Sequence, residues 1–242
     1  MSPAVSVVIP AYNEQARLPY TLSEIEAFLR RQNLDCEVIV VDNGSEDATS
    51  AVVQQASGTF AGLRLLRTDA RGKGTAVRTG MLAARGSVVL FADADLSWSV
   101  EDLQRFVSLV SASRPVVIGS REGLGARRIG EPGYRHVMGR VFNRVVQALA
   151  VPGIEDSQCG FKAFTAEAAQ AVFNRQRIHG FGFDVEVLYL ARRLGFDVHV
   201  VPLRWEHKEN SRVAPVGDTL GMLSDVLRVR INDWRGVYGL PR

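Results

Sequence analysis

The sequence is poor in cysteine. Cys36 and Cys159 are its two cysteines among 242 residues, and neither lies at a metal-ligand spacing from other cysteines or histidines. Two such thiols give no disulfide framework, and a reducing compartment is the default for a chain of this kind. We therefore expect the protein in the cytoplasm.

Long apolar runs are also missing. No uninterrupted apolar stretch approaches the ~18 residues that a membrane-spanning helix needs, so we expect no transmembrane segment. The first residues, Met1–Val5, contain neither a basic nor a long apolar stretch, so no signal peptide is expected.

The net charge is small but unevenly distributed. A value of +3 is too low to indicate nucleic-acid binding. Between Arg121 and Gln147, however, six arginines stand against two glutamates, a net +4, so the rest of the chain carries −1. A basic segment of this kind can meet a phosphate group or an anionic membrane surface, which makes a peripheral place on the cytoplasmic face of a membrane the alternative location.

Two common nucleotide-binding motifs are absent. The chain has no Gly-x-x-x-x-Gly-Lys-Ser/Thr loop and no Gly-x-Gly-x-x-Gly after its first expected strand. Both absences argue against a P-loop NTPase and against a NAD-dependent enzyme.

What is present is an alternation of buried strands and amphipathic helices. Predominantly apolar runs predict strands at 5–9, 38–41, 63–66, 88–92, 116–118 and 198–201. Helical spacing predicts helices near 18–29, 49–57, 75–84, 101–111, 134–150, 183–194 and 219–230. This order is typical of an α/β protein with a Rossmann-like, mostly parallel sheet and helices on both faces. We expect one domain over residues 1–242, with a nucleotide-binding half (1–95), a second half (96–218) and a helical tail (219–242).

The strand at 88–92 leads directly into two acids, Asp93 and Asp95. The carboxyl end of a strand in an open α/β sheet is where ligands bind. Residues two apart in an extended segment share a face, so both carboxylates can point at one object. Hard oxygen ligands suit Mg²⁺ or Mn²⁺. Taken alone, an Asp-x-Asp is more simply explained as a solvated turn, but the upstream chain favours the metal site.

A glycine-rich basic loop, Arg71–Gly74, opens the helix expected at 75–84. Its backbone N–H groups could cradle a phosphate at a helix N-terminus. A tight turn with Lys73 in solvent is the alternative.

The second half offers fewer periodic signals. The stretch from Glu122 to Gly133 is rich in glycine and is interpreted as a mobile loop. The helix after it places Arg140 and Arg144, four residues apart, on one face. Those arginines either meet an anionic membrane surface or are simply solvated.

Several motifs in order resemble a known family. These are Val7–Glu14, Val40–Asp47, Gly72–Gly74, Asp93–Asp95, Gly119–Arg121, Asp156–Lys162 and Phe183–Tyr189. The first four resemble family 2 glycosyltransferases of the GT-A fold. The last three resemble dolichyl-phosphate β-glucosyltransferases and, more loosely, dolichyl-phosphate mannosyltransferases. Two features depart from these relatives: we expect no N-terminal membrane anchor, and Ser97 stands where the mannosyltransferases usually have a glutamine.

The resemblance implies a donor site for a nucleotide sugar, UDP-glucose in preference to GDP-mannose. The nucleotide would be held by Pro10, Ala11, Tyr12, Glu14, Asp42, Gly44, Lys73 and Asp93. Asp93 and Asp95 would hold Mg²⁺ or Mn²⁺ on the donor diphosphate, and with Asp184 they form the expected catalytic set.

The resemblance also implies a polyprenyl phosphate as the acceptor, bound by the second half of the chain. Its phosphate would be held by Arg121, Arg135, Arg127 and Arg128, and Asp156, Gln158 and Asp184 would line the sugar and acceptor pocket. A soluble hydroxyl or small phosphorylated acceptor is the alternative, and a hydroxyl would require Asp184 or Asp156 as general base. A non-catalytic nucleotide-sugar binding module is a second alternative, which the intact Asp-x-Asp disfavours.

Overall fold

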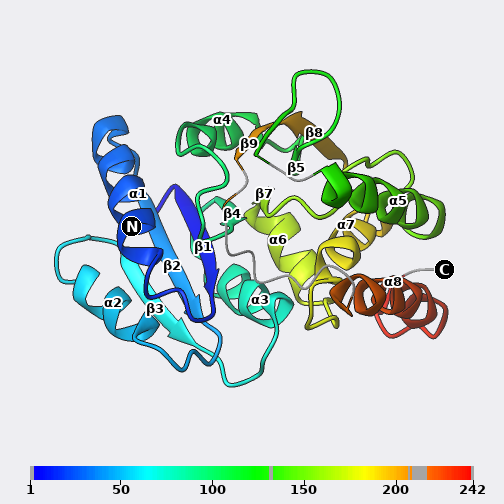
Figure 1. Cartoon of the computed structure of the whole chain (residues 1–242), viewed down its shortest axis with the longest axis horizontal. Helices are drawn as coiled ribbons and strands as arrows, with labels where there is room; N and C mark the ends of the chain where they lie inside the picture. Colours follow the sequence, from blue (N-terminus) through cyan, green and yellow to red (C-terminus); the bar gives the residue numbers. More distant parts are fainter. Residues whose placement is uncertain (1–2, 131–132, 207, 209–216, 241–242) are drawn as a thin grey trace.

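A computed structural model gives the structure of the protein and describes residues 3–130, 133–206, 208 and 217–240. Its centre is a seven-stranded sheet with helices on both faces (Figure 1). In spatial order the strands are β3 (Leu63–Arg67), β2 (Cys36–Asp42), β1 (Val5–Ala11), β4 (Val88–Ala92), β7 (Phe161–Thr165), β5 (Val116–Ser120) and β8 (Val198–Pro202). The prediction of a mostly parallel sheet covered on both faces is confirmed.

The helices follow the expected positions closely. They are α1 (Leu18–Gln32), α2 (Thr49–Ala56), α3 (Lys73–Ala83), α4 (Glu101–Leu109), α5 (Gly133–Leu149), α6 (Ala166–Phe173), α7 (Phe183–Arg193) and α8 (Gly217–Trp234). Of these, α6 was not predicted. Among the helices of the described residues, none combines the length and the apolar character needed to cross a membrane.

One strand breaks the parallel order. β7 runs antiparallel to both of its neighbours, β4 and β5, whereas the other paired strands of this sheet are parallel. The sequence analysis predicted no strand at 161–165, because a buried lysine interrupts the apolar pattern of β7.

The stretch expected to be a mobile loop contains a short strand instead. β6 (Arg127–Ile129) pairs in parallel with β9 (Arg204–Glu206). Three-residue strands carry too little periodicity to be recognised in a sequence. Within this stretch, residues 131 and 132 lie outside the described residues.

The sheet has a separate apolar core on each face, because successive strand residues point to opposite sides. In β1, Val8 packs with residues of α3 and α7, whereas Val7 and Ile9 pack with residues of α1. The long buried strands β1, β2 and β4 are thereby fixed in register, and their carboxyl ends meet at one edge.

Candidate active site

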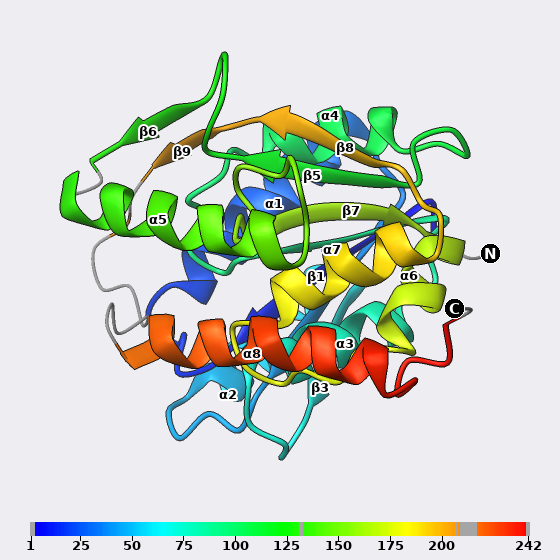
Figure 2. The same cartoon turned by 90° about the vertical axis from the view of Figure 1, so that its right-hand side faces the viewer.

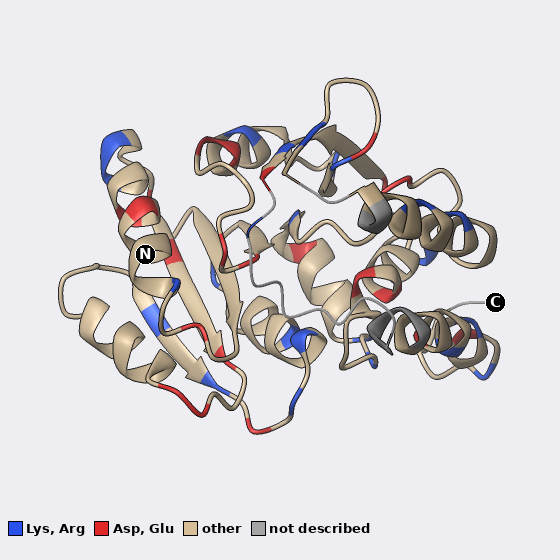
Figure 3. Cartoon of the chain, viewed as in Figure 1, with Lys and Arg blue, Asp and Glu red and all other residues tan. Residues whose placement is uncertain are grey.

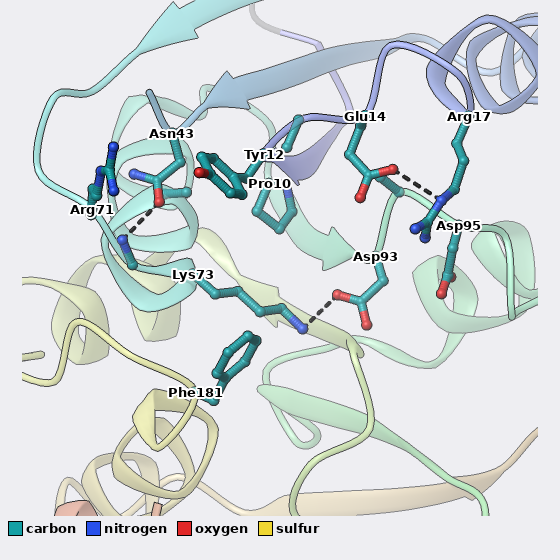
Figure 4. Close-up of a pocket in the computed structure, with 14 residues that line it drawn as sticks. Pro10, Tyr12, Glu14, Arg17, Asn43, Arg71, Lys73, Asp93, Asp95 and Phe181 are labelled. Atoms are coloured by element: carbon teal, nitrogen blue, oxygen red, sulfur yellow. Dashed lines mark hydrogen bonds and ion pairs between the residues drawn. The ribbon is translucent and has the colours of Figure 1, made fainter. Parts of the chain in front are cut away.

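The carboxyl ends of β1, β2 and β4 open onto a cavity of about 380 Å³ (Figure 4). Seven of the predicted site residues line it: Pro10, Ala11, Tyr12, Glu14, Lys73, Asp93 and Asp95. The lining also includes Arg71 and Gly72 of the predicted glycine-rich loop. Its remaining members, which the sequence analysis did not select, are Arg17, Asn43, Ala76, Ala94 and Phe181. The pocket is thus built mainly from the first 95 residues, with Phe181 contributed from just before α7.

Asp93 and Asp95 are held by the backbone around them. The N–H of Asp93 donates to the carbonyl of Gly160 at 3.0 Å, and the indole of Trp98 donates to the carbonyl of Asp93 at 2.9 Å. The N–H of Ser97 donates to Asp95 Oδ1 at 3.0 Å. Burial and the neighbouring charge of Asp93 raise the pKa of Asp95. A cation bound between the two carboxylates would offset their repulsion and favour the charged form of Asp95.

Lys73 already places one cation at this pair. Its Nζ lies 2.6 Å from Asp93 Oδ1 (Figure 4). Burial alone would lower the pKa of Lys73, but the carboxylates of Asp93 and Asp184 raise it. The side chain is therefore a permanent positive charge beside the two acids.

Gly72, which precedes Lys73, lies close to the backbone of His179. A Cβ on Gly72 would lie 2.2 Å from the carbonyl oxygen of His179, and the φ of Gly72 is 127°. Only glycine combines that conformation with so close an approach. The predicted glycine-rich loop thus fixes the start of α3 at the pocket.

The carboxylates of Asp93 and Asp95 fit a divalent cation whose remaining ligands come from a substrate. Among the described residues, no group of three or more His, Cys, Asp and Glu side chains is arranged to hold a metal by itself. Mg²⁺ commonly takes one or two carboxylates and completes its shell with phosphate oxygens and water. Asp93 and Asp95 meet that requirement.

Asp42 and Gly44 do not line the cavity, whereas Asn43, which stands between them, does. Asp42 accepts hydrogen bonds from the N–H of Ser45 at 2.9 Å and from the hydroxyl of Ser50. Burial alone would raise the pKa of Asp42, but these bonds lower it. Asn43 Oδ1 accepts from the N–H of Gly72 at 2.7 Å, joining two loops of the site. Asn43 could have been predicted as a site residue from the sequence, because it follows Asp42 at the end of a buried strand.

Arg121 is engaged by a buried acid. Its Nε and Nη2 donate to the two oxygens of Asp156, each at 2.8 Å, and its guanidinium carbon lies 5.3 Å from the centre of the Trp205 ring. Asp156 is fully buried, and although burial alone would raise its pKa, Arg121 lowers it to about 2. This pair joins the end of β5 to the segment before β7.

Of the other predicted arginines, Arg128 lies beside Arg121, because its Nε donates to the carbonyl of Arg121 at 3.3 Å. Arg128 forms an ion pair with Glu122 at 2.8 Å, while Arg127 is exposed on β6. The side chain of Arg135 lies outside the described residues. Phosphate binding by these arginines and by Arg121 stays a prediction.

Asp184 and Gln158 are both found near β7. Lys162 of β7 is fully buried, forms an ion pair with Asp184, and donates to the carbonyl of Cys159 at 2.7 Å. Burial is the main cause that raises the pKa of Asp184. Gln158 Nε2 is buried and has no hydrogen-bond partner among the described residues. Neither Asp184 nor Gln158 lines the cavity.

We predict that Arg121→Lys lowers the free energy of unfolding by about 2 kcal/mol, because a single ammonium cannot reproduce the two-pronged bond to a buried carboxylate. The pKa of Asp156 falls from its ordinary 3.8 to about 2, so its stabilising contribution is complete above about pH 4 and is lost as the pH falls through 2. Urea unfolding at neutral pH measures the loss, with the exposed Arg127→Lys as the matched control. Unchanged stability together with a raised acceptor KM would contradict this role and make Arg121 a phosphate ligand.

The sheet order and the helices on both of its faces are those of the GT-A fold. The chain belongs to the glycosyl transferase family 2, whose family model matches residues 6–173. The resemblance found in the motifs is thereby confirmed, and the protein is an enzyme.

Curated relatives cover nearly the whole chain. It is 38% identical to the dolichyl-phosphate beta-glucosyltransferase of Mus musculus, over 98% of this chain and 78% of the relative. It is 34% identical to the enzyme of the same name from Dictyostelium discoideum, over 97% of this chain and 76% of the relative.

Among solved structures, glucosyl-3-phosphoglycerate synthase from Mycobacterium tuberculosis in complex with UDP has a TM-score of 0.68 at 20% identity. The match covers 99% of this chain and 82% of that one. A second structure of that enzyme, with Mn²⁺, UDP and phosphoglyceric acid, has a TM-score of 0.65. At this identity the likeness establishes the fold.

Proposed function

We propose that the protein transfers glucose from UDP-glucose to a polyprenyl phosphate such as dolichyl phosphate and forms a β-linked lipid phosphosugar. The observation that carries the proposal is the similarity to dolichyl-phosphate beta-glucosyltransferases along 96% or more of the chain in four organisms. The pocket supports it, since it brings together six of the eight predicted nucleotide residues and both acids of the Asp-x-Asp pair.

On the donor side, Tyr12, Asn43 and Arg71 lie at one end of the pocket, where the nucleoside would bind (Figure 4). Lys73, Asp93 and Asp95 lie toward the other end, where they would face the diphosphate. A divalent ion on Asp93 and Asp95 would neutralise the charge that develops on the departing UDP. Lys73 adds a second positive charge at 2.6 Å from Asp93 Oδ1. Its ammonium can therefore donate to a phosphate oxygen in the same pocket.

On the acceptor side, the acids near the site suit a phosphate better than a hydroxyl. A hydroxyl needs a general base, but Asp156, with a pKa of about 2, is too weak a base, and Asp184 is bound by the Lys162 ammonium. A phosphate monoester is largely a dianion at neutral pH, with its second pKa near ~6. It can attack the anomeric carbon without a base, and one displacement inverts an α-linked donor to a β-linked product.

The function is tested with a panel of radiolabelled nucleotide sugars, each offered polyprenyl phosphate and phosphoglyceric acid together in the presence of Mg²⁺ or Mn²⁺. The proposal expects label in the organic phase, from UDP-glucose in preference to GDP-mannose. Label that stays in an aqueous product would support the soluble-acceptor alternative and contradict the proposal.

We predict that Asp42→Ala weakens UDP binding about tenfold, because Asp42 holds the loop that positions Asn43, and one or two hydrogen bonds are lost. Asn43→Ala should have a similar effect, because it removes the hydrogen bond that the N–H of Gly72 donates to Asn43 Oδ1. Isothermal titration with UDP and GDP measures both variants against the exposed Asp197→Ala as control. Unchanged affinity for UDP in both variants would remove this loop from the nucleotide site.

A further inference from the structure

The turn that follows β4 contains a residue in an unfavourable backbone conformation. The φ of Leu96, directly after Asp95, is 49°, in the left-handed region that a leucine rarely adopts. Among the described residues, the other non-glycine residues with a positive φ are Asn13 and Asn33, and asparagine tolerates that region better. Acidic residues mark the segment after β4 in Figure 3. A leucine stays in such a conformation only where surrounding groups hold the backbone.

One group that holds this turn comes from α1. Thr21 Oγ1 donates to the carbonyl of Ala94, the residue between the two acids, at 2.7 Å. Thr21 is 1% exposed and lies among apolar residues on the buried face of α1. A threonine in a helix commonly directs its hydroxyl proton to a carbonyl of the preceding helical turn, but Thr21 directs it to another segment. The hydroxyl therefore serves the turn of the two acids rather than the helix that carries it.

Two further carbonyls of the turn are held as well. The indole of Trp98, which is itself buried, donates to the carbonyl of Asp93 at 2.9 Å. The N–H of Glu206 in β9 donates to the carbonyl of Ser97 at 2.9 Å. β9 lies beside β6 (Figure 2), so this bond ties the turn to the second half of the chain. The backbone around Leu96 is thus fixed by groups from separate parts of the fold.

The peptide group after Ala94 decides how the two carboxylates are related in space. Both carboxylates extend from the turn to the same side (Figure 4). Rotation of this peptide group would turn the side chain of Asp95 away from that of Asp93. Repulsion between the two like charges favours such a rotation, and so does relief of the left-handed conformation of Leu96. The hydrogen bond from Thr21 to the Ala94 carbonyl opposes both tendencies.

We propose that Thr21 is a positioning residue for the metal site. Its hydroxyl fixes the Ala94 peptide so that the carboxylates of Asp93 and Asp95 converge on one divalent cation, whose near-octahedral shell tolerates little displacement of its ligands. Thr21 does not line the cavity and acts through the two acids. The inference rests on the proposed function, which assigns a metal to these acids, and it adds α1 to the elements that set the affinity for that metal.

Two substitutions separate the hydroxyl of Thr21 from its shape. Thr21→Val keeps the branched shape and removes the donor, whereas Thr21→Ser keeps the donor and removes a methyl group. The EPR signal of free Mn²⁺, titrated in the presence of UDP, measures metal binding without turnover. Thr21→Val should weaken Mn²⁺ binding about tenfold through the loss of one buried hydrogen bond, and Thr21→Ser should stay within about twofold of wild type.

A purely structural role for Thr21 would give the opposite order, because serine lacks the methyl group that fills space in the core. Thr21→Val that binds Mn²⁺ as tightly as wild type would therefore overturn the inference. Thr79→Val on α3 is the matched control, since Thr79 donates to the carbonyl of Thr75 in its own helix at 2.9 Å. It should leave Mn²⁺ binding unchanged, and a loss equal to that of Thr21→Val would also overturn the inference.

Thr21→Ala provides a second test in case the valine variant does not fold, because alanine removes the same donor without placing a new methyl group against the Ala94 carbonyl. It should show the same loss of Mn²⁺ affinity, about tenfold. Isothermal titration with UDP in the absence of metal should give the wild-type affinity in both variants. An equal loss of metal-free UDP affinity would overturn the inference, since the whole pocket would then be displaced.

Kinetics separate this inference from the proposed function. In Thr21→Val the Mn²⁺ concentration for half-maximal rate should rise about tenfold, while kcat at saturating Mn²⁺ should approach that of wild type. Glucose transfer to polyprenyl phosphate by Thr21→Val with an unchanged Mn²⁺ dependence would overturn the inference alone. Weakened Mn²⁺ binding in Thr21→Val, beside a wild type that transfers no glucose to polyprenyl phosphate, would overturn the proposed function alone.

Discussion

Asp95→Asn is expected to lower kcat about 10²–10³-fold, the typical cost of removing one well-placed electrostatic stabiliser of a transition state. The asparagine oxygen can still accept the hydrogen bond that Asp95 Oδ1 takes from the N–H of Ser97, so the local backbone should be retained. What is lost is a negative charge, and with it one of the two carboxylates that we propose as ligands for a cation on the donor diphosphate. Steady-state kinetics at saturating UDP-glucose measure the effect.

Asp197→Asn, an exposed acid remote from the cavity, is the matched control and should be fully active. A chelator should abolish wild-type turnover, and added Mn²⁺ or Mg²⁺ should restore it. Near-full activity of Asp95→Asn, or turnover that a chelator leaves unchanged, would contradict the assignment of Asp93 and Asp95 to a metal.

Gly160→Ala is expected to lower kcat/KM about 10²-fold without unfolding the protein. A Cβ at Gly160 would lie 1.9 Å from Asp93 Oδ2 and 2.4 Å from its Cγ. The φ of Gly160 lies outside the left-handed region, so alanine fits the backbone. The carboxylate of Asp93 must then rotate away, which displaces it from Lys73 and from the donor diphosphate.

Gly139→Ala on α5 is the control, because nothing lies within 4 Å of its Cβ position. Circular dichroism and the melting temperature should show both variants folded, whereas kinetics and Mn²⁺-dependent UDP binding should separate them. Equal kinetics in the two variants would show that Asp93 needs no fixed orientation.

The acidic residues at the ends of β2 and β4 could be predicted from the sequence, because each directly follows an unbroken apolar run. Val38–Val41 leads to Asp42 and Val88–Ala92 leads to Asp93, and parallel strands bring such ends to one edge. The pocket forms at that edge. The donor side therefore follows from local sequence and sheet topology.

The second half could not be predicted in the same way, because its contacts join residues far apart in the chain. Lys162 interrupts the apolar run of β7, and its burial is made tolerable by the ion pair with Asp184, 22 residues away, together with the hydrogen bond to the carbonyl of Cys159. Arg121 looks in the sequence like a phosphate ligand, but Asp156, 35 residues away, already binds it on both oxygens. Pairings at such separations leave no periodic signal.

The central claim is that the enzyme glycosylates the phosphate of a polyprenyl phosphate. Phosphorus NMR of a reaction with UDP-glucose, a divalent metal ion and the lipid follows both substrates at once. The account predicts that the acceptor monoester signal is replaced by a phosphodiester signal, at the rate at which UDP appears. Release of UDP with the monoester signal unchanged would contradict it.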